Sequence, residues 1–195
     1  MTDQSDIQLA GHDPRKRERL LEAAAADFAR VGFDRANLDA ITRNAGVAKG
    51  TIYLYFPSKS ALFAAVLDEL RRRLEAQLVA TECPGADPAS TLRSVIQAHL
   101  ALADTAPDLF RCYTSALFGV NREFQRSALS IFSWQTSLLE RLLAPGRRHS
   151  ARTTQRATLL AGSILSAALV RGLMGRARSG TALEEDALIA MVSAP

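Results

Sequence analysis

Hydroxyl and ammonium groups and a glycine gather in one short stretch of the 195-residue chain, residues 48–59. A protein element that enters the major groove of DNA needs small residues where its backbone approaches the duplex, and polar groups for phosphates and base edges. Gly50 permits that approach, and Thr51 suits a base edge or a thymine methyl group. The full set of candidate DNA-binding residues is Lys49, Gly50, Thr51, Tyr53, Tyr55 and Lys59, with Asn37 and Arg15 from the segments before them.

Two short helices joined by a tight turn must position this stretch. Asn37 offers an N-cap oxygen to the first helix, whose apolar residues recur at the three-to-four spacing of a helix with one buried face. Gly46 can take the positive φ that a sharp helix-to-helix turn requires. The second helix is expected over residues 48–56, and Pro57 ends it before Ser58 caps the next helix.

Positive charge is concentrated in the same part of the chain. Residues 15–60 hold nine Lys or Arg against five Asp or Glu, whereas residues 61–195 hold fifteen against twelve. A local surplus of this kind is the electrostatic footprint expected of a nucleic-acid-binding surface. The alternative for the same residues is an ordinary helical hairpin with exposed tyrosines.

The string AGVAKGTIYLYFPSKSALF, from Ala45 to Phe63, resembles the DNA-binding signature of TetR-like bacterial transcriptional regulators. In that signature a Gly-Val turn, a Gly-Thr-hydrophobic-Tyr core and a Phe-Pro-Ser-Lys exit occur in this order. The resemblance implies a three-helix DNA-binding domain, a larger ligand-binding and dimerising domain, and repression relieved by a small molecule. This chain has Tyr55 where the family often has His, and Ser60 where it often has an acidic residue, so the operator preference stays open.

The composition predicts an all-α protein of about nine helices, because alanine and leucine abound while runs of valine and isoleucine are few. We expect a mobile N-terminal arm over residues 1–14, a three-helix helix-turn-helix domain over 15–60, and a helical ligand-binding and dimerisation domain over 61–195. A connecting helix at about 58–80 joins the two domains. The other helices are expected at about 15–31, 38–45, 48–56, 89–103, 107–118, 121–143, 152–177 and 182–193.

Four residues of the larger domain place a polar atom on or beside an apolar helix face: His99, Tyr113, Trp134 and Gln135. Small-molecule pockets are mainly apolar with a few inward polar groups, so these are the candidate ligand-binding residues. For each of them the alternative is a core residue that a neighbour satisfies, and for any single one the pattern favours that alternative. We expect an apolar or aromatic effector, because the domain has few candidate inward charges beyond Arg111 and Arg122.

Small residues recur along the segment 152–177, where they would let two helices approach closely. The resemblance implies that the last two helices form a four-helix interface in a homodimer. The alternative is that the small residues pack inside one subunit. In a dimer, two recognition helices related by a twofold axis read a palindromic operator.

Other classes of function lack their usual residue patterns. The sequence has no paired carboxylates, nucleophile with a base, Gly-rich phosphate loop or metal-ligand spacing, so we expect neither an enzyme nor a cofactor or metal site. Cys83 and Cys112 are expected to be reduced thiols in a cytoplasm, a redox-sensing pair being the alternative. No secretory leader or membrane span is expected, since the longest apolar run is interrupted by serine and arginine.

The leading hypothesis is therefore a cytoplasmic, dimeric transcriptional repressor that binds double-stranded DNA at a palindromic operator and is released by a small molecule. The alternative is a helix-turn-helix protein that is regulated by a protein partner, or that binds DNA without small-molecule control.

Overall fold

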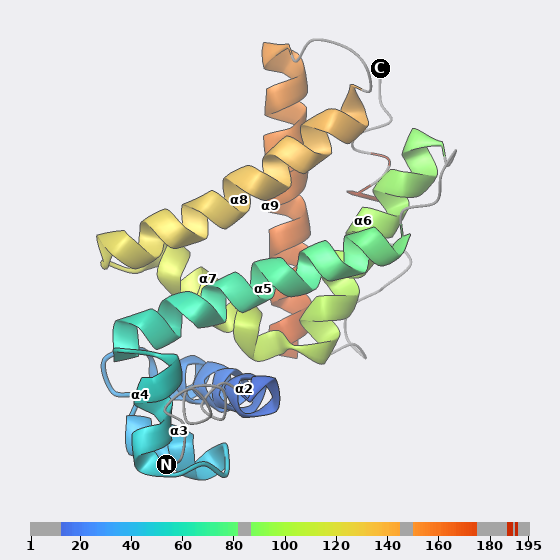
Figure 1. The fold of residues 1–195 in the computed structure, drawn as a ribbon. Coiled ribbons are helices and arrows are strands. Elements are labelled where there is room, and N and C mark those ends of the chain that lie inside the picture. Colours follow the sequence, from blue (N-terminus) through green and yellow to red (C-terminus); the bar gives the residue numbers. More distant parts are fainter. Residues whose placement is uncertain (1–12, 82–86, 145–149, 175–186, 189, 191–195) are drawn as a thin grey trace, which may run out of the picture. The chain divides into compact units, whose positions relative to one another are not determined.

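The computed structural model describes residues 13–81, 87–144, 150–174, 187–188 and 190. Within them it has eight α-helices, one 3-10 turn and no strand, which confirms the all-α fold (Figure 1). The ninth expected helix, 182–193, lies largely outside the described residues. The elements are α2 (Pro14–Val31), α3 (Leu38–Asn44), η1 (Lys49–Thr51), α4 (Ile52–Tyr55), α5 (Lys59–Thr81), α6 (Pro88–Thr105), α7 (Pro107–Phe118), α8 (Arg122–Leu143) and α9 (Ala151–Met174).

The chain forms two compact units, an N-terminal unit of Met1–Glu69 and a body of Leu70–Pro195. The division falls within α5, later than the expected domain boundary at residue 60. Helix α5 itself agrees with the expected connecting helix at about 58–80. Each unit has its own buried core and is described by itself.

Aromatic rings form the centre of the N-terminal unit. The ring of Phe63 meets Phe28 edge-on at a centroid distance of 5.0 Å and Phe33 at 5.5 Å. Phe28 and Phe63 are buried, together with apolar residues from every helix of this unit. Because aromatic pairs add specific geometry to a large buried area, this cluster fixes α2 against α5 and the loop after α2.

The start of α2 has a cap that the sequence reading missed. The side chain of Asp13 accepts a hydrogen bond of 2.9 Å from the backbone N–H of Arg15, and Pro14 occupies the first helical position. The cap places a carboxylate at the positive end of the helix dipole, which offsets the basic residues of the first turn. Helix α2 therefore includes Pro14, which was assigned to the arm, and residues 1–12 lie outside the described part.

The turn between α3 and the next element is formed as expected. Gly46 has φ +64°, and its N–H donates to the Arg43 carbonyl while the N–H of Val47 donates to the Thr42 carbonyl. These two bonds satisfy the last carbonyls of α3 in the Schellman arrangement, which needs a left-handed residue at Gly46. A side chain there would be strained, so this glycine is required by the fold.

The second helix of the pair differs from the expectation of one helix over 48–56. It is a 3-10 turn, η1, followed by the single turn of α4. Gly50 lowers helix propensity in the middle of this short stretch, and the extended backbone of Phe56 before Pro57 ends it. The 3-10 turn is the tighter form commonly found at helix ends.

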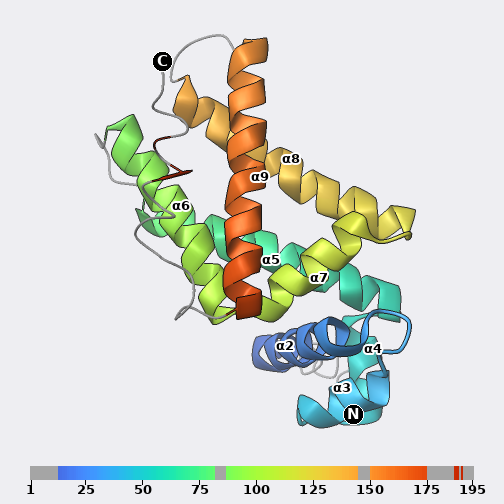
Figure 2. The same ribbon diagram turned by 180° about the vertical axis from the view of Figure 1, so that it is seen from behind.

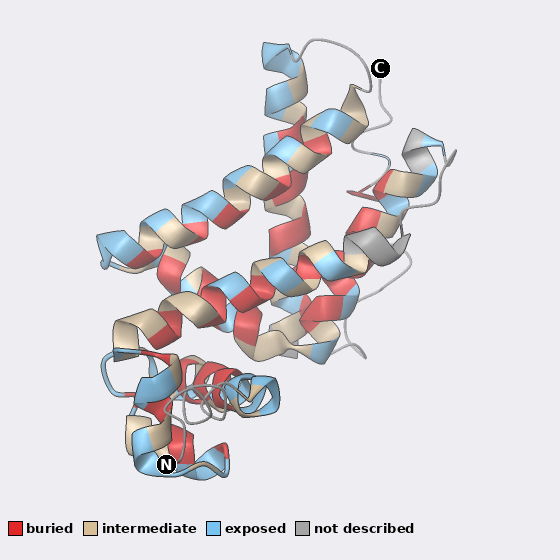
Figure 3. Ribbon diagram, in the orientation of Figure 1, coloured by how far each residue is buried: buried red, intermediate tan, exposed pale blue. Residues whose placement is uncertain are grey.

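The body is a bundle of four mutually packed helices, in which α9 contacts α6, α7 and α8. Figures 1 and 2 show α9 crossing α8. Buried residues lie along α8 on the side that faces the bundle, with exposed residues on the other (Figure 3). None of the helices in the described ranges is long and apolar enough to cross a membrane.

Small residues of α9 are used inside the subunit. Ala157, Ala161 and Ala168 are fully buried, and the first two belong to an apolar core with residues from α6 and α8. For these three positions the structure supports packing within one subunit, the alternative raised from the sequence. Among the described side chains of α9, the large apolar ones that are exposed are Leu159 and Val170.

Candidate functional site

One side of η1 and α4 is open to solvent although it carries apolar and aromatic groups. Tyr53 is 56% exposed and Leu54 is 61% exposed, whereas Ile52 and Phe56 are buried beneath them. The buried pair fixes the element to the core, and the exposed groups have no role in that packing. We call the recognition face the set of the exposed Lys49, Gly50, Tyr53 and Leu54 with the half-buried Thr51.

Gly50 is not required by the fold. Its φ lies outside the left-handed region, and a Cβ added at this position would meet nothing within 4 Å. Gly46, in contrast, has a positive φ and needs to be glycine. A glycine on an exposed face that neither the backbone nor the packing requires is consistent with close approach by another molecule.

Lys49 is held by an acidic partner on α3. Its Nζ donates a hydrogen bond of 2.7 Å to Oδ2 of Asp39, and both side chains are exposed. The hydrogen bond first, and the charge of Asp39 second, raise the pKa of Lys49 above its ordinary value. The lysine therefore remains charged and is positioned at the edge of the recognition face, a role for Asp39 that sequence spacing did not reveal.

We expect Lys49→Ala to weaken DNA binding similarly for all sequences and to reduce the slope of log affinity against log salt by about 0.9, the value for one phosphate contact in duplex DNA. Fluorescence anisotropy titrations over a range of salt concentrations measure both effects. Arg122→Ala removes an exposed positive charge of the body and serves as the charge-matched control. An equal change of slope in both variants would contradict a phosphate contact by Lys49.

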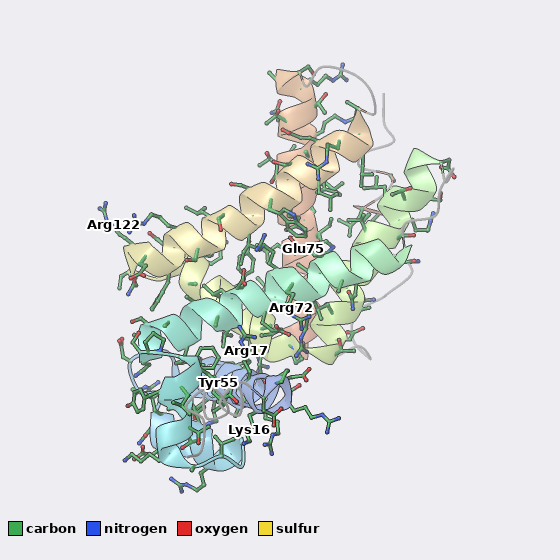
Figure 4. All side chains as sticks on the ribbon, in the orientation of Figure 1. Lys16, Arg17, Tyr55, Arg72, Glu75 and Arg122 are labelled. Carbon is green, nitrogen blue, oxygen red and sulfur yellow. The ribbon has the colours of Figure 1, made fainter. Side chains whose placement is uncertain are left out.

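Two other candidate phosphate donors contact the protein itself. Nζ of Lys59 donates to the Asp34 carbonyl at 2.9 Å and lies 4.9 Å from the centre of the Phe33 ring. The Tyr55 hydroxyl, which is placed beside the start of α2 in Figure 4, donates to the Asp13 carbonyl at 3.2 Å. Tyr55 thus ties the end of α4 to the start of α2, and Lys59 ties the start of α5 to the loop after α2. Contact of either side chain with phosphate stays a prediction.

Asn37 and Arg15 occupy the ends of helices. Asn37 is the N-cap of α3, as expected, and its Oδ1 accepts a hydrogen bond of 2.8 Å from the Asp39 N–H. Arg15 is exposed in the first turn of α2. Both are accessible within the N-terminal unit, and their proposed contacts with DNA remain predictions.

A buried carboxylate that the sequence reading missed connects α2 to α3. Asp27 is only 3% exposed; its Oδ2 accepts a hydrogen bond of 3.2 Å from the Asn37 N–H, and its Oδ1 accepts one from Arg30. An acidic residue on the inner side of an otherwise apolar helix was the only signal in the sequence. The carboxylate fixes where α3 begins, and thereby the position of the turn that follows.

We expect Asp27→Ala to lower the free energy of unfolding of the N-terminal unit by about 1–3 kcal/mol, because it leaves a partly buried backbone N–H without its acceptor. Asp34→Ala removes an exposed carboxylate nearby and is expected to stay within about 0.5 kcal/mol of the wild type. Hydrogen exchange of the α2 and α3 amides measures the difference. Equal protection in both variants would show that Asp27 is not a structural link.

The four candidate ligand-binding residues fall on three neighbouring helices of the body. His99 on α6, Tyr113 on α7 and Gln135 on α8 are buried, while Trp134 is half-buried against the apolar core of α6, α8 and α9. Burial lowers the pKa of His99 to about 4, against a smaller opposing effect of its hydrogen bond with Val95. Burial also raises the pKa of Tyr113.

The expectation about inward charges was wrong for both arginines. Arg111 is exposed and donates to Asp108 and the Gly172 carbonyl, and Arg122 points away from the bundle at the start of α8 (Figure 4). Within the part of the chain that the structure describes, the buried arginine is Arg171 of α9, which is 4% exposed and lies 3.8 Å from the Asp104 carboxylate. Its place between small residues of α9 was the available signal in the sequence.

Cysteine and metal chemistry have little support in the described part of the chain. The Cys112 thiol is buried, and burial, with a smaller contribution from Asp108, raises its pKa to about 12. It is therefore protonated and poorly reactive near neutral pH. Cys83 lies outside the described residues, and within those residues no group of three or more His, Cys, Asp or Glu could hold a metal ion.

Comparison with known proteins agrees with the assignment of the N-terminal unit as a helix-turn-helix DNA-binding domain. Residues 20–66 match the family model described as bacterial regulatory proteins, tetR family. A 62-residue segment is 42% identical to the HTH-type transcriptional repressor SCO4008 of Streptomyces coelicolor, covering 31% of this chain and 32% of that protein. The chain spans less than a third of the length of two further curated relatives, the uncharacterized HTH-type transcriptional regulators YvdT and YdgC of Bacillus subtilis.

Solved structures resemble the whole fold. A TetR-like transcriptional regulator from Rhodococcus sp. RHA1 has a TM-score of 0.75 with 24% identity, over 91% of this chain and 93% of that one. The regulator FadR from Bacillus subtilis, solved in complex with stearoyl-CoA, has a TM-score of 0.70 with 21% identity, over 90% of this chain and 96% of that one. At these identities the similarity establishes the fold alone.

The evidence for the family is therefore strongest where the recognition face lies. The matched segment contains the core of α2, the capped turn at Gly46 and every residue of the recognition face. Residues 20–66 thus form a tetR-family helix-turn-helix domain, and the whole chain has the fold of TetR-like transcriptional regulators.

Proposed function

We propose that the protein is a repressor that binds a palindromic operator as a homodimer and is released by a small-molecule effector. The observation that carries the proposal is the recognition face. It exposes Tyr53 and Leu54, and it contains a glycine, Gly50, that the fold does not require. Groups of this kind, rigidly supported by Ile52 and Phe56, fit the close approach and base contacts of a helix in the major groove. The relative named a repressor supports repression as the direction of control.

Selection of fragments from a genomic DNA pool by the full chain tests sequence-specific binding. We expect enrichment of a palindrome, and we expect Thr51→Ala to change the preferred bases within each half-site, because its hydroxyl and methyl are assigned to base edges. Failure to enrich any palindrome with the wild-type protein would contradict the proposal of an operator-binding dimer. An unchanged preference in Thr51→Ala would remove Thr51 from base recognition.

Dimerisation is proposed for the outer side of α9. Leu159 is 60% exposed and Val170 is 41% exposed on this helix, and Ser166 between them is also exposed. These positions recur at helical spacing, so they form one stripe on which a second copy can pack, as the resemblance to the family implies.

We expect sedimentation equilibrium to give a dimer for the wild-type protein and a population shifted to monomer for Leu159→Glu. The introduced carboxylate would be buried without a partner in the dimer but solvated in the monomer. Leu129→Glu, on an exposed position of α8, is the control for the added charge. The interface is misplaced if Leu159→Glu remains as fully dimeric as the control.

Control by a small molecule is proposed for the body. His99, Tyr113 and Gln135 combine burial with polar atoms inside a mainly apolar bundle, the composition that ligand pockets share. The FadR relative in fold that was solved with stearoyl-CoA supports the idea that such a body can take a ligand. A ligand that binds one conformation of the protein more tightly would shift the population away from DNA.

A further inference from the structure

Nε2 of His99, Oη of Tyr113 and Nε2 of Gln135 are buried atoms that have no hydrogen-bond partner among the described residues, and Oε1 of Gln77 on α5 is a further one. The side chains of His99, Tyr113 and Gln135 are 2%, 2% and 4% exposed, and they come from α6, α7 and α8, each of which contacts the other two. Buried polar groups in native proteins are nearly always satisfied, and each exception requires an explanation. Three exceptions on adjacent helices point to one polar occupant inside the bundle.

The hydrogen positions on His99 follow from its backbone contact. Nδ1 lies 2.7 Å from the Val95 carbonyl oxygen, and because a carbonyl only accepts, Nδ1 carries the proton and donates. Burial lowers the pKa of the ring to about 4, so the ring is neutral at pH 7. Nε2 therefore has a lone pair and accepts, so its missing partner must be a donor.

The other two atoms have the opposite requirement. Burial raises the pKa of Tyr113, so the phenol keeps its proton and can donate it. Nε2 of Gln135 carries two N–H groups and can only donate. The occupant must therefore donate one hydrogen bond and accept at least one.

We propose that the effector is an uncharged molecule with a hydroxyl group, which donates to His99 and accepts from Tyr113 or Gln135. A hydroxyl offers both functions, whereas an ether, ketone, thioester or carboxylate oxygen only accepts. A charged group would also have to be buried, which is costly without a partner, and the buried Arg171 is already beside Asp104. This inference rests on the proposed small-molecule control, and it distinguishes the effector from an acyl-CoA, whose phosphates are charged.

The test uses matched sets of probes on naphthalene, biphenyl and decyl scaffolds, each as the hydroxyl compound, its methyl ether and its carboxylate. Ligand-observed NMR with the full chain, in the absence of DNA, measures their dissociation constants. We expect the hydroxyl compound of at least one scaffold to bind about tenfold or more tightly than its ether and its carboxylate, the size of effect when a buried polar atom loses its partner.

Two variants assign the preference to the proposed contact. His99→Phe removes the acceptor, so it should make the hydroxyl compound and its ether bind equally. Thr114→Val removes a hydroxyl from the same bundle that already donates to the Phe110 carbonyl, and it should keep the preference. Circular dichroism tests whether both variants are folded. If His99→Phe does not fold, the comparison of probes on the wild-type protein still tests the proposal.

The proposal is overturned if, on every scaffold that binds, the ether or the carboxylate binds as tightly as its hydroxyl partner. It is overturned equally if no hydroxyl compound binds on any scaffold, since an ordered water would then be the occupant of these three atoms. The selection of operator DNA uses no probe, and the probe measurements use no DNA. Failure of the selection would therefore contradict the proposed repressor function without changing the result on probe binding.

Discussion

Phe63→Ala is expected to lower the free energy of unfolding of the N-terminal unit by about 3–5 kcal/mol. Phe63 is 2% exposed, and its ring is the one that contacts both Phe28 and Phe33 edge-on. Alanine leaves a cavity at the junction of α2, α5 and the loop between α2 and α3. A loss of this size is a large part of the roughly 5–15 kcal/mol that stabilises a typical domain.

The consequence for function is loss of operator binding, because the recognition face is mounted on this core through Ile52 and Phe56. Phe118→Ala is the matched control, since Phe118 is 77% exposed in the body and its removal is expected to change stability by no more than about 0.5 kcal/mol. Hydrogen exchange of amides in α2 and α5 reports the local unfolding free energy, and fluorescence anisotropy reports binding. Equal hydrogen-exchange protection of the α2 and α5 amides in Phe63→Ala and Phe118→Ala would show that the aromatic cluster does not stabilise the unit.

Local features of the DNA-binding unit could be predicted from the sequence because single residues determine them. Asn37 caps α3, Gly46 takes the left-handed conformation, and the Ser58 hydroxyl accepts from the Ala61 N–H. Each depends on the conformational or hydrogen-bonding preference of one side chain for its own neighbours. The helix order of the body was predictable for a similar reason, as the loops contain proline and glycine.

Contacts between distant parts of the chain could not be predicted in the same way. The Tyr55 hydroxyl reaches the carbonyl of Asp13, 42 positions earlier, and Lys59 reaches the carbonyl of Asp34, 25 positions earlier. Residue type favoured phosphate contact for both, and only the tertiary arrangement reveals the backbone acceptors. The burial of Arg171 was missed for the same reason. Arg171 on α9 lies beside Asp104 on α6, whereas the side chains of Arg111 and Arg122 are exposed to solvent.

Gly50→Leu is expected to leave the fold intact and to weaken operator binding by at least about tenfold. A Cβ at this position would meet no protein atom within 4 Å, and the residue is exposed, so the rest of the side chain can extend into solvent. Leucine also favours a helical turn over glycine, so thermal stability should be equal or slightly higher. On DNA the same side chain would keep the backbone from the duplex, and the loss of even one good base contact costs about 1–3 kcal/mol.

Gly46→Ala is the contrasting substitution, because it changes a glycine that the fold requires. Its φ of +64° is unfavourable for alanine, so we expect a loss of about 1–2 kcal/mol in stability. Thermal melts and operator titrations of the two variants should thus separate the roles: Gly46 acts through the fold and Gly50 through the contact. An operator affinity of Gly50→Leu equal to that of the wild type would mean that DNA does not approach this face, and the recognition face would then need another partner.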